Sequence, residues 1–156
     1  MPTNKPTKLE NFKLHQRFEF KINKLARLMQ DRLESGLEKY GITRVQWIAL
    51  TAISIENKRS PSDLAQHIGV SRPAVSRMLR LMESLDLIDR SLIGDDGRTR
   101  QLNLTDKGHL CMNLCWPHAR ETEQYFLSKV SESQREALSS MLSAFMLAEP
   151  EVLDEN

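Results

Sequence analysis

Arginine is concentrated in one short stretch of this sequence. Between positions 71 and 81 there are three arginines, Arg72, Arg77 and Arg80, and no acidic residue. A guanidinium group can bind a phosphate, or it can donate two parallel hydrogen bonds to the O6 and N7 atoms of guanine in a major groove. The stretch therefore predicts either a surface that contacts nucleic acid or a basic helix face that meets only solvent.

A second pair of arginines, Arg98 and Arg100, follows in a segment with the pattern of a β-hairpin, residues 87–104. Residues 95–97 read Asp-Asp-Gly, which forms turns readily, and the alternating leucines after them are typical of a half-buried strand. The two arginines would project from the turn and from the returning strand. A loop tipped with arginine suits a minor groove, where negative potential attracts guanidinium groups. The hairpin therefore favours the nucleic-acid interpretation.

Cys111, Cys115 and His118 are the other residues whose spacing could do chemistry, because one helix would bring them to neighbouring turns. Thiolates and imidazole suit zinc, and two thiols can form a redox pair. However, cysteines one turn apart in an intact helix seldom have disulfide geometry, and three ligands from one helix leave the coordination incomplete. Cysteine is also a common buried apolar residue. Packing is therefore the favoured interpretation, and a redox or metal response through Cys111 and Cys115 is the alternative.

Two short helices must position the first group of arginines. Ser60 followed by proline is a helix start, Gly69 can take the left-handed conformation that ends this helix, and Ser71 is the next N-cap. The second helix, 71–85, has apolar residues at spacings of three and four, which predicts one buried face opposite the arginines. These residues are Val75, Met78, Leu79, Met82 and Leu85. The order is helix, turn, helix and hairpin, that is, a winged helix–turn–helix.

Further helices are expected on both sides of this unit. A long helix over 9–40 has apolar residues on more than one side and so needs more than one neighbour. A helix from Thr43 has the spacing of a capping box with Gln46. Two more helices follow the hairpin over 105–149. These flanking helices cannot all bury their apolar faces on so small a unit, so we expect a helical dimerisation layer built from both chain ends of two subunits.

Composition limits the alternatives. The chain has 156 residues, 40% of them hydrophobic, and a net charge of only +1, so it suffices for one domain and any attraction to nucleic acid must come from a local patch. No apolar run approaches the ~18 residues of a membrane span and no signal-peptide core is present, which favours a cytoplasmic protein. No phosphate-loop, metallohydrolase or nucleophile-elbow motif appears, so we expect neither catalysis nor a cofactor.

Residues 96–105 resemble the wing signature D-x-R-x-x-x-L-x-L-T of the MarR family of bacterial transcription regulators, and all five defined positions match. Residues 62–65 (Ser-Asp-Leu-Ala) and 69–71 (Gly-Val-Ser) are similar to that family's usual entry into its recognition helix. The order of elements fits from about residue 9 to 148. The resemblance implies a mainly α fold with a small β-hairpin wing. Its single domain would span 9–149, with the DNA-binding unit at 43–104, dimerisation helices at 9–40 and 105–149, a flexible arm at 1–8 and an acidic tail at 150–156.

The resemblance also implies roles for individual residues. Arg98 would be the wing-tip arginine, oriented by the carboxylate of Asp96, and Arg80 would contact a phosphate. The residues expected to form the DNA-binding surface are Ser71, Arg72, Pro73, Ala74, Ser76, Arg77, Arg80, Asp96, Arg98, Thr99 and Arg100.

The expected function is a homodimeric transcription regulator, most simply a repressor, that binds a pseudo-palindromic DNA operator. In the family that it resembles, small effectors, often aromatic or phenolic anions, bind between the dimerisation helices and the winged unit and lower DNA affinity. The alternative from another class is a winged-helix protein-interaction module whose arginines meet an acidic partner.

Overall fold

The computed structural model describes residues 13–93, 99–147 and 149. Within these residues the chain is mainly helical with one β-hairpin, and the predicted fold class is confirmed. The elements are α1 (Phe18–Leu37), α2 (Arg44–Ser54), α3 (Pro61–Ile68), α4 (Arg72–Ser84), β1 (Ile88–Ile93), β2 (Thr99–Leu104), α5 (Asp106–Leu127) and α6 (Glu132–Met146), with the 3-10 helices η1 (Leu14–Gln16) and η2 (Glu38–Tyr40). The expected arm at 1–8 and tail at 150–156 lie outside the described residues.

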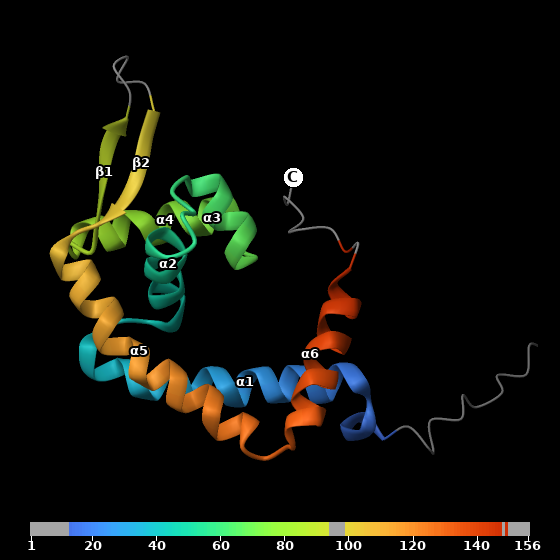
Figure 1. Ribbon diagram of the computed structural model, residues 1–156. Coiled ribbons are helices and arrows are strands. Elements are labelled where there is room, and N and C mark those ends of the chain that lie inside the picture. Colours follow the sequence, from blue (N-terminus) through green and yellow to red (C-terminus); the bar gives the residue numbers. More distant parts are fainter. Residues whose placement is uncertain (1–12, 94–98, 148, 150–156) are drawn as a thin grey trace, which may run out of the picture.

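The elements form two groups (Figure 1). Helices α1 and α5 run alongside each other, and α2, α3, α4 and the hairpin form a compact unit over one end of this pair. Helix α6 crosses α1 near its other end. None of the helices in the described part of the chain is long and apolar enough to cross a membrane.

The predicted starts of α2, α3 and α4 are confirmed. Ser60 Oγ accepts a hydrogen bond from the backbone N–H of Asp63 at 3.0 Å. Gly69 ends α3 with a φ of 76°, and Ser71 caps α4. Thr43 and Gln46 form both hydrogen bonds of the expected capping box. The winged unit is therefore encoded locally, by side chains within three residues of the backbone groups that they satisfy.

Two helix ends differ from the sequence prediction. The first helix begins at Phe18 rather than near residue 9, because the backbone N–H groups of Gln16 and Arg17 bond three residues back and form the separate turn of η1. At its other end α1 stops at Leu37, and η2 carries the chain to Gly41, whose φ is 67°. These differences shorten the regular helix.

The core lies mostly within the winged unit, where α2, α3, α4 and the hairpin meet α5. Val75, Leu79 and Met82 are fully buried, as the predicted apolar face of α4 requires. Leu85 was expected on the same face and is 38% exposed, because the helix ends there and its backbone leaves helical geometry. Leu87 and Leu102 of the hairpin segment are also buried, so the base of the wing belongs to the core.

Candidate nucleic-acid interface

The candidate recognition surface is the outer side of α4. The side chains of Arg72, Pro73, Ser76, Arg77 and Arg80 are exposed, and those of Ser71 and Ala74 are partly buried. The opposite side of the helix is fully buried. Because that apolar face is fixed in the core, the arginine face has one orientation relative to the rest of the unit.

The N-terminus of α4 adds to the positive potential of this surface. Its first turn carries no acidic residue, and Ser71 Oγ accepts from the backbone N–H of Ala74 at 3.4 Å. A helix N-terminus presents backbone N–H groups and the positive end of the helix dipole, both of which suit phosphate. The arginine side chains and the helix N-terminus therefore both attract phosphate.

The hairpin begins beside the end of α4. Its strands are antiparallel, with Ile88 opposite Leu104 and Ile93 opposite Thr99. Arg90 of β1 forms an ion pair at 2.8 Å with Glu83 in the last turn of α4. The wing is thus tied to the recognition helix at its base.

Not all of the expected wing residues can be described. Thr99 and Arg100 lie in β2, where the backbone of Arg100 is opposite Leu92. Asp96 and Arg98 lie outside the described residues. Their assigned roles therefore stay predictions, as do the DNA contacts of α4.

A junction that the sequence did not indicate fixes α4 to α5. The carbonyl oxygen of Leu87 accepts from the backbone N–H of Thr105 at 3.2 Å, and the Thr105 hydroxyl donates to the carbonyl of Asp86 at 2.6 Å. Lys107 Nζ donates to the carbonyl of Leu85 at 2.6 Å. A Cβ atom on Gly108 would lie 2.0 Å from the Leu87 oxygen. The only hint in the sequence was a glycine in the first turn of a helix, where glycine is unfavourable.

A pocket lies between the winged unit and the long helices. It has a volume of about 320 Å³ and is lined by α1, α2 and α5. Trp47 and Trp116 both line it, with ring centroids 6.3 Å apart and planes inclined by 33°. Trp116 is 47% exposed, whereas Trp47 is largely buried and its indole N–H donates to the carbonyl of Met112. The capping sequence had indicated only a packing role for Trp47.

The charges around this pocket favour an anion. Arg44 and Arg120 line it together with one carboxylate, that of Glu123. Leu33 and Met29 of α1 add apolar contacts. Pockets that bind small molecules combine apolar and aromatic walls with a few polar groups. This one has the composition to hold a flat apolar molecule that carries a negative charge.

The cysteine and histidine cluster does not come together as a site. Cys115 is fully buried, and burial raises the pKa of its thiol to about 11, with a further contribution from Cys111. The ring of His118 lies instead against η2, where its Nε2 atom is 3.2 Å from the Tyr40 hydroxyl. Among the described residues no three His, Cys, Asp or Glu side chains could hold a metal ion. Cys115 is a core residue, as the packing interpretation requires.

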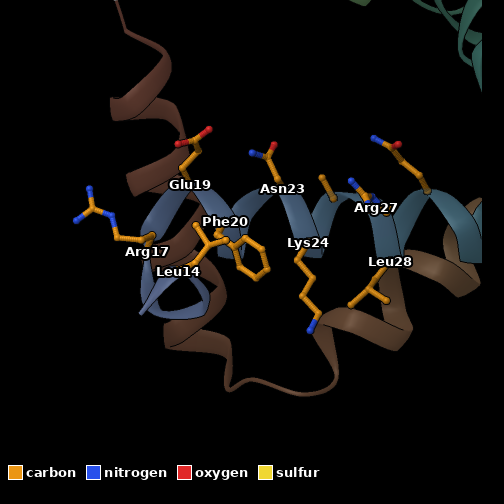
Figure 2. A pocket seen from close by; sticks show the side chains of 10 residues that line it. Leu14, Arg17, Glu19, Phe20, Asn23, Lys24, Arg27 and Leu28 are labelled. Carbon is orange, nitrogen blue, oxygen red and sulfur yellow. The ribbon is translucent and has the colours of Figure 1, made fainter. Parts of the chain in front are cut away.

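Two helices carry apolar side chains that the described residues leave exposed. In α6 no residue is buried, and Phe145 is 57% exposed although its ring lies 5.0 Å from that of Phe18. Along the first half of α1 lies a groove of about 860 Å³. Figure 2 shows Phe20, Lys24 and Leu28 on one side of α1 within this groove. Exposed apolar side chains gathered on two neighbouring helices are typical of a protein–protein contact.

Comparison with known proteins agrees with this architecture. Residues 40–99 match the family model described as the MarR family. The structure of the MepR–DNA complex from S. aureus is 23% identical, covers 83% of this chain and 94% of that chain, and superposes with a TM-score of 0.75. AbsC, a MarR family transcriptional regulator from Streptomyces coelicolor, is 24% identical, with coverages of 80% and 86% and a TM-score of 0.72.

A third similar structure was solved with a small molecule. It is the organohalide-sensing transcriptional regulator RdhR-CbdbA1625 in its 2,4-dichlorophenol-bound form, which is 16% identical, with coverages of 94% and 87% and a TM-score of 0.76. The fold is thus that of a winged-helix protein. More narrowly, it is the winged-helix fold of MarR-family transcriptional regulators, and the resemblance found in the sequence is confirmed.

Proposed function

We propose that this protein is a homodimeric transcription regulator that binds a specific DNA operator and acts as a repressor. The observation that carries the proposal is α4, whose exposed side bears three arginines and no acidic residue between positions 72 and 80, while the side chains of Val75, Leu79 and Met82 on its opposite side are fully buried. Such a helix fits a major groove, where arginine reads guanine or holds a phosphate. The similarity to MepR, which was solved bound to DNA, supports the same conclusion.

A second copy of the chain is the partner that best explains the uncovered helices. Many of the exposed apolar residues lie on α1 and α6, away from the arginine surface, so a dimer could bury these and leave both α4 helices free. Closed two-fold association is the commonest form of oligomer. It would present two recognition helices about one DNA turn apart and so requires an inverted-repeat operator.

The pocket between α1, α2 and α5 is the proposed effector site. Its two tryptophans and two arginines suit an aromatic or phenolic anion, and a structural relative was solved with 2,4-dichlorophenol. Helix α5 lines the pocket and is also bonded to the end of α4 through Thr105 and Lys107. An effector that binds better when α5 has moved would therefore disfavour the DNA-binding arrangement, whereas equal affinity for both arrangements would change nothing.

Selection from a random duplex library tests the DNA-binding proposal. Purified protein should enrich an inverted repeat with half-sites about ten base pairs apart. The Arg77→Ala variant should recover a degraded consensus if this residue reads a base. Enrichment of no sequence would overturn the proposal and favour the protein-interaction alternative.

Tryptophan fluorescence tests the effector site without DNA. Titration with 2,4-dichlorophenol and with aromatic carboxylates should change the emission, because Trp116 is half-exposed in the pocket. The Trp116→Phe variant should lose most of this change while binding DNA normally. Because Trp47 is the other tryptophan of the chain and lines the same pocket, unchanged emission of the parent protein would mean that the ligand binds elsewhere.

A further inference from the structure

The loop between α2 and α3 is joined to the wing. The backbone N–H of Leu102 donates to the carbonyl of Arg59 at 2.9 Å, so this loop lies against β2. The Arg59 guanidinium then donates from Nη1 to Oδ1 of Asn103 at 3.4 Å. Asn103 Nδ2 in turn lies 2.6 Å from the hydroxyl of Ser91. We name Arg59, Asn103 and Ser91 the loop–wing network.

The network lies on the outer face of the hairpin. Arg90 is paired with Leu102, which is buried, so these two residues share the face turned to the core. Successive residues of a strand point to opposite faces, which puts Asn103 and Ser91 on the other side. In the register they are diagonal neighbours on the two strands, close enough for polar side chains to meet. Arg59 therefore connects to both strands at once.

Arg59 also adjoins the start of α3. It directly precedes Ser60, the N-cap of that helix. The loop that carries it is held by its own backbone, since Lys58 N–H donates to Ala52 and Arg59 N–H to Asn57, which has a φ of 56°. Among the described residues no carboxylate pairs with Arg59, and its side chain is partly buried. Its guanidinium is thus directed to the wing by a neutral amide.

We propose that Arg59 is a positioning residue for DNA binding, which acts through Asn103 to hold the wing at a fixed angle to α3 and α4. This inference rests on the proposed function, because it concerns how the wing and the recognition helix reach one duplex together. A planar guanidinium suits this role because its donors point in fixed directions, whereas lysine is a flexible point charge. The loop–wing network sets the geometry, and the wing arginine Arg98 makes the contact.

Affinity for the selected operator tests the proposal. Arg59→Ala and Asn103→Ala should each weaken binding by roughly 2- to 30-fold, the range expected for residues that couple without touching the ligand. The double variant should be no weaker than the weaker single variant, because both remove the same connection. In an Arg98→Ala background neither should matter, since the contact that they position is gone. Lys58→Ala, which removes the same charge one residue away, is the matched control and should bind nearly like the parent.

The salt dependence of binding separates positioning from a direct contact. Arg59→Ala and Asn103→Ala should change the slope of log affinity against log salt by the same amount, because both act through the same wing contact. If Arg59 held a phosphate itself, Arg59→Ala would reduce that slope by about one unit and Asn103→Ala would have little effect, which would overturn the proposal. Unchanged affinity in both variants would overturn it equally. Thermal midpoints of all variants identify any that have simply lost their fold.

Hydrogen exchange of the free protein keeps this test independent of the proposed function. Asn103→Ala should accelerate exchange of the hairpin amides, including Leu102, while the amides of α4 stay protected as in the parent. If the parent protein bound every duplex equally, the proposed function would be wrong. Hydrogen exchange would still show whether the loop–wing network holds the hairpin. Hairpin exchange that is unchanged in Asn103→Ala would show that the network does not hold the wing.

Discussion

Replacing Gly108 by alanine is the most direct perturbation of the junction between the DNA-binding unit and the long helices. The added Cβ atom would lie 2.0 Å from the carbonyl oxygen of Leu87 and 3.0 Å from the carbonyl carbon. Ordinary contacts begin at 3.4 Å, so α5 and the start of β1 would have to separate by more than 1 Å. Both atoms belong to the backbone and cannot rotate away. The same movement would stretch the hydrogen bond from Thr105 N–H to the Leu87 carbonyl, now 3.2 Å long.

The expected cost follows from opposing effects on the free energy of unfolding. Alanine is better than glycine inside a helix by about 1 kcal/mol. Overpacking at a rigid site costs about 1–3 kcal/mol, and a weakened hydrogen bond costs about 0.5–1.5 kcal/mol. The net destabilisation should therefore be about 1–3 kcal/mol. For a domain of this size that lowers the melting temperature by roughly 2–12 °C.

Thermal unfolding followed by circular dichroism measures this shift, with protein concentration held equal because dimerisation would contribute to stability. Gly36→Ala is the milder comparison, because its Cβ atom would lie 3.0 Å from the Cβ atom of His118, so that neighbour would have to move by only a few tenths of an ångström. We expect Gly36→Ala to lower the melting temperature much less than Gly108→Ala does. If Gly108→Ala melted at or above the parent temperature, the junction would be looser than the structure indicates, and the proposed coupling of α5 to α4 would lose its basis.

Three further predictions concern the other surfaces. Arg98→Ala should weaken binding to all duplexes that use the minor-groove contact, whereas Arg77→Ala should also relax base preference; competition titrations with substituted operators measure the difference. Phe145→Glu should convert a dimer into monomers in sedimentation velocity, because a charge would face the buried apolar surface; a variant that stays dimeric would mean that α6 is outside the interface. Cys115 should resist iodoacetamide up to about pH 9 while the protein is folded, and Cys111 should react first. Because folding raises the pKa of Cys115 to about 11, its contribution to stability is complete below pH ~9 and is lost as the pH rises toward 11, which denaturant titrations at several pH values can measure.

The parts of the fold that the sequence could predict are those decided within a few residues. The capping side chains of Ser60, Ser71 and Thr43 bond to backbone groups three residues away, so their spacing is visible in the sequence. The buried side of α4 follows in the same way from helical periodicity. Leu85 is exposed although the periodicity placed it on the buried face, because periodicity does not show where a helix ends.

The features that escaped prediction depend on contacts between distant segments. Arg59 and Asn103 are 44 positions apart, and Trp47 meets the backbone of Met112 across 65 positions. Neither pairing leaves a trace in local composition. Gly108 is unfavourable for a helix taken alone, and only the carbonyl of Leu87 explains it. The pocket and the junction could therefore be recognised only in the folded structure, because they depend on which distant residues come into contact.

The measurement that tests the central claim most directly is the affinity of the parent protein for its selected operator relative to random duplex, at two salt concentrations. Specific recognition predicts a preference of roughly 10³-fold or more, with two chains bound per duplex. Equal affinity for every duplex, falling steeply with salt, would mean that the arginines of α4 supply only non-specific attraction to phosphate. That result would contradict the assignment of this protein as a sequence-specific regulator.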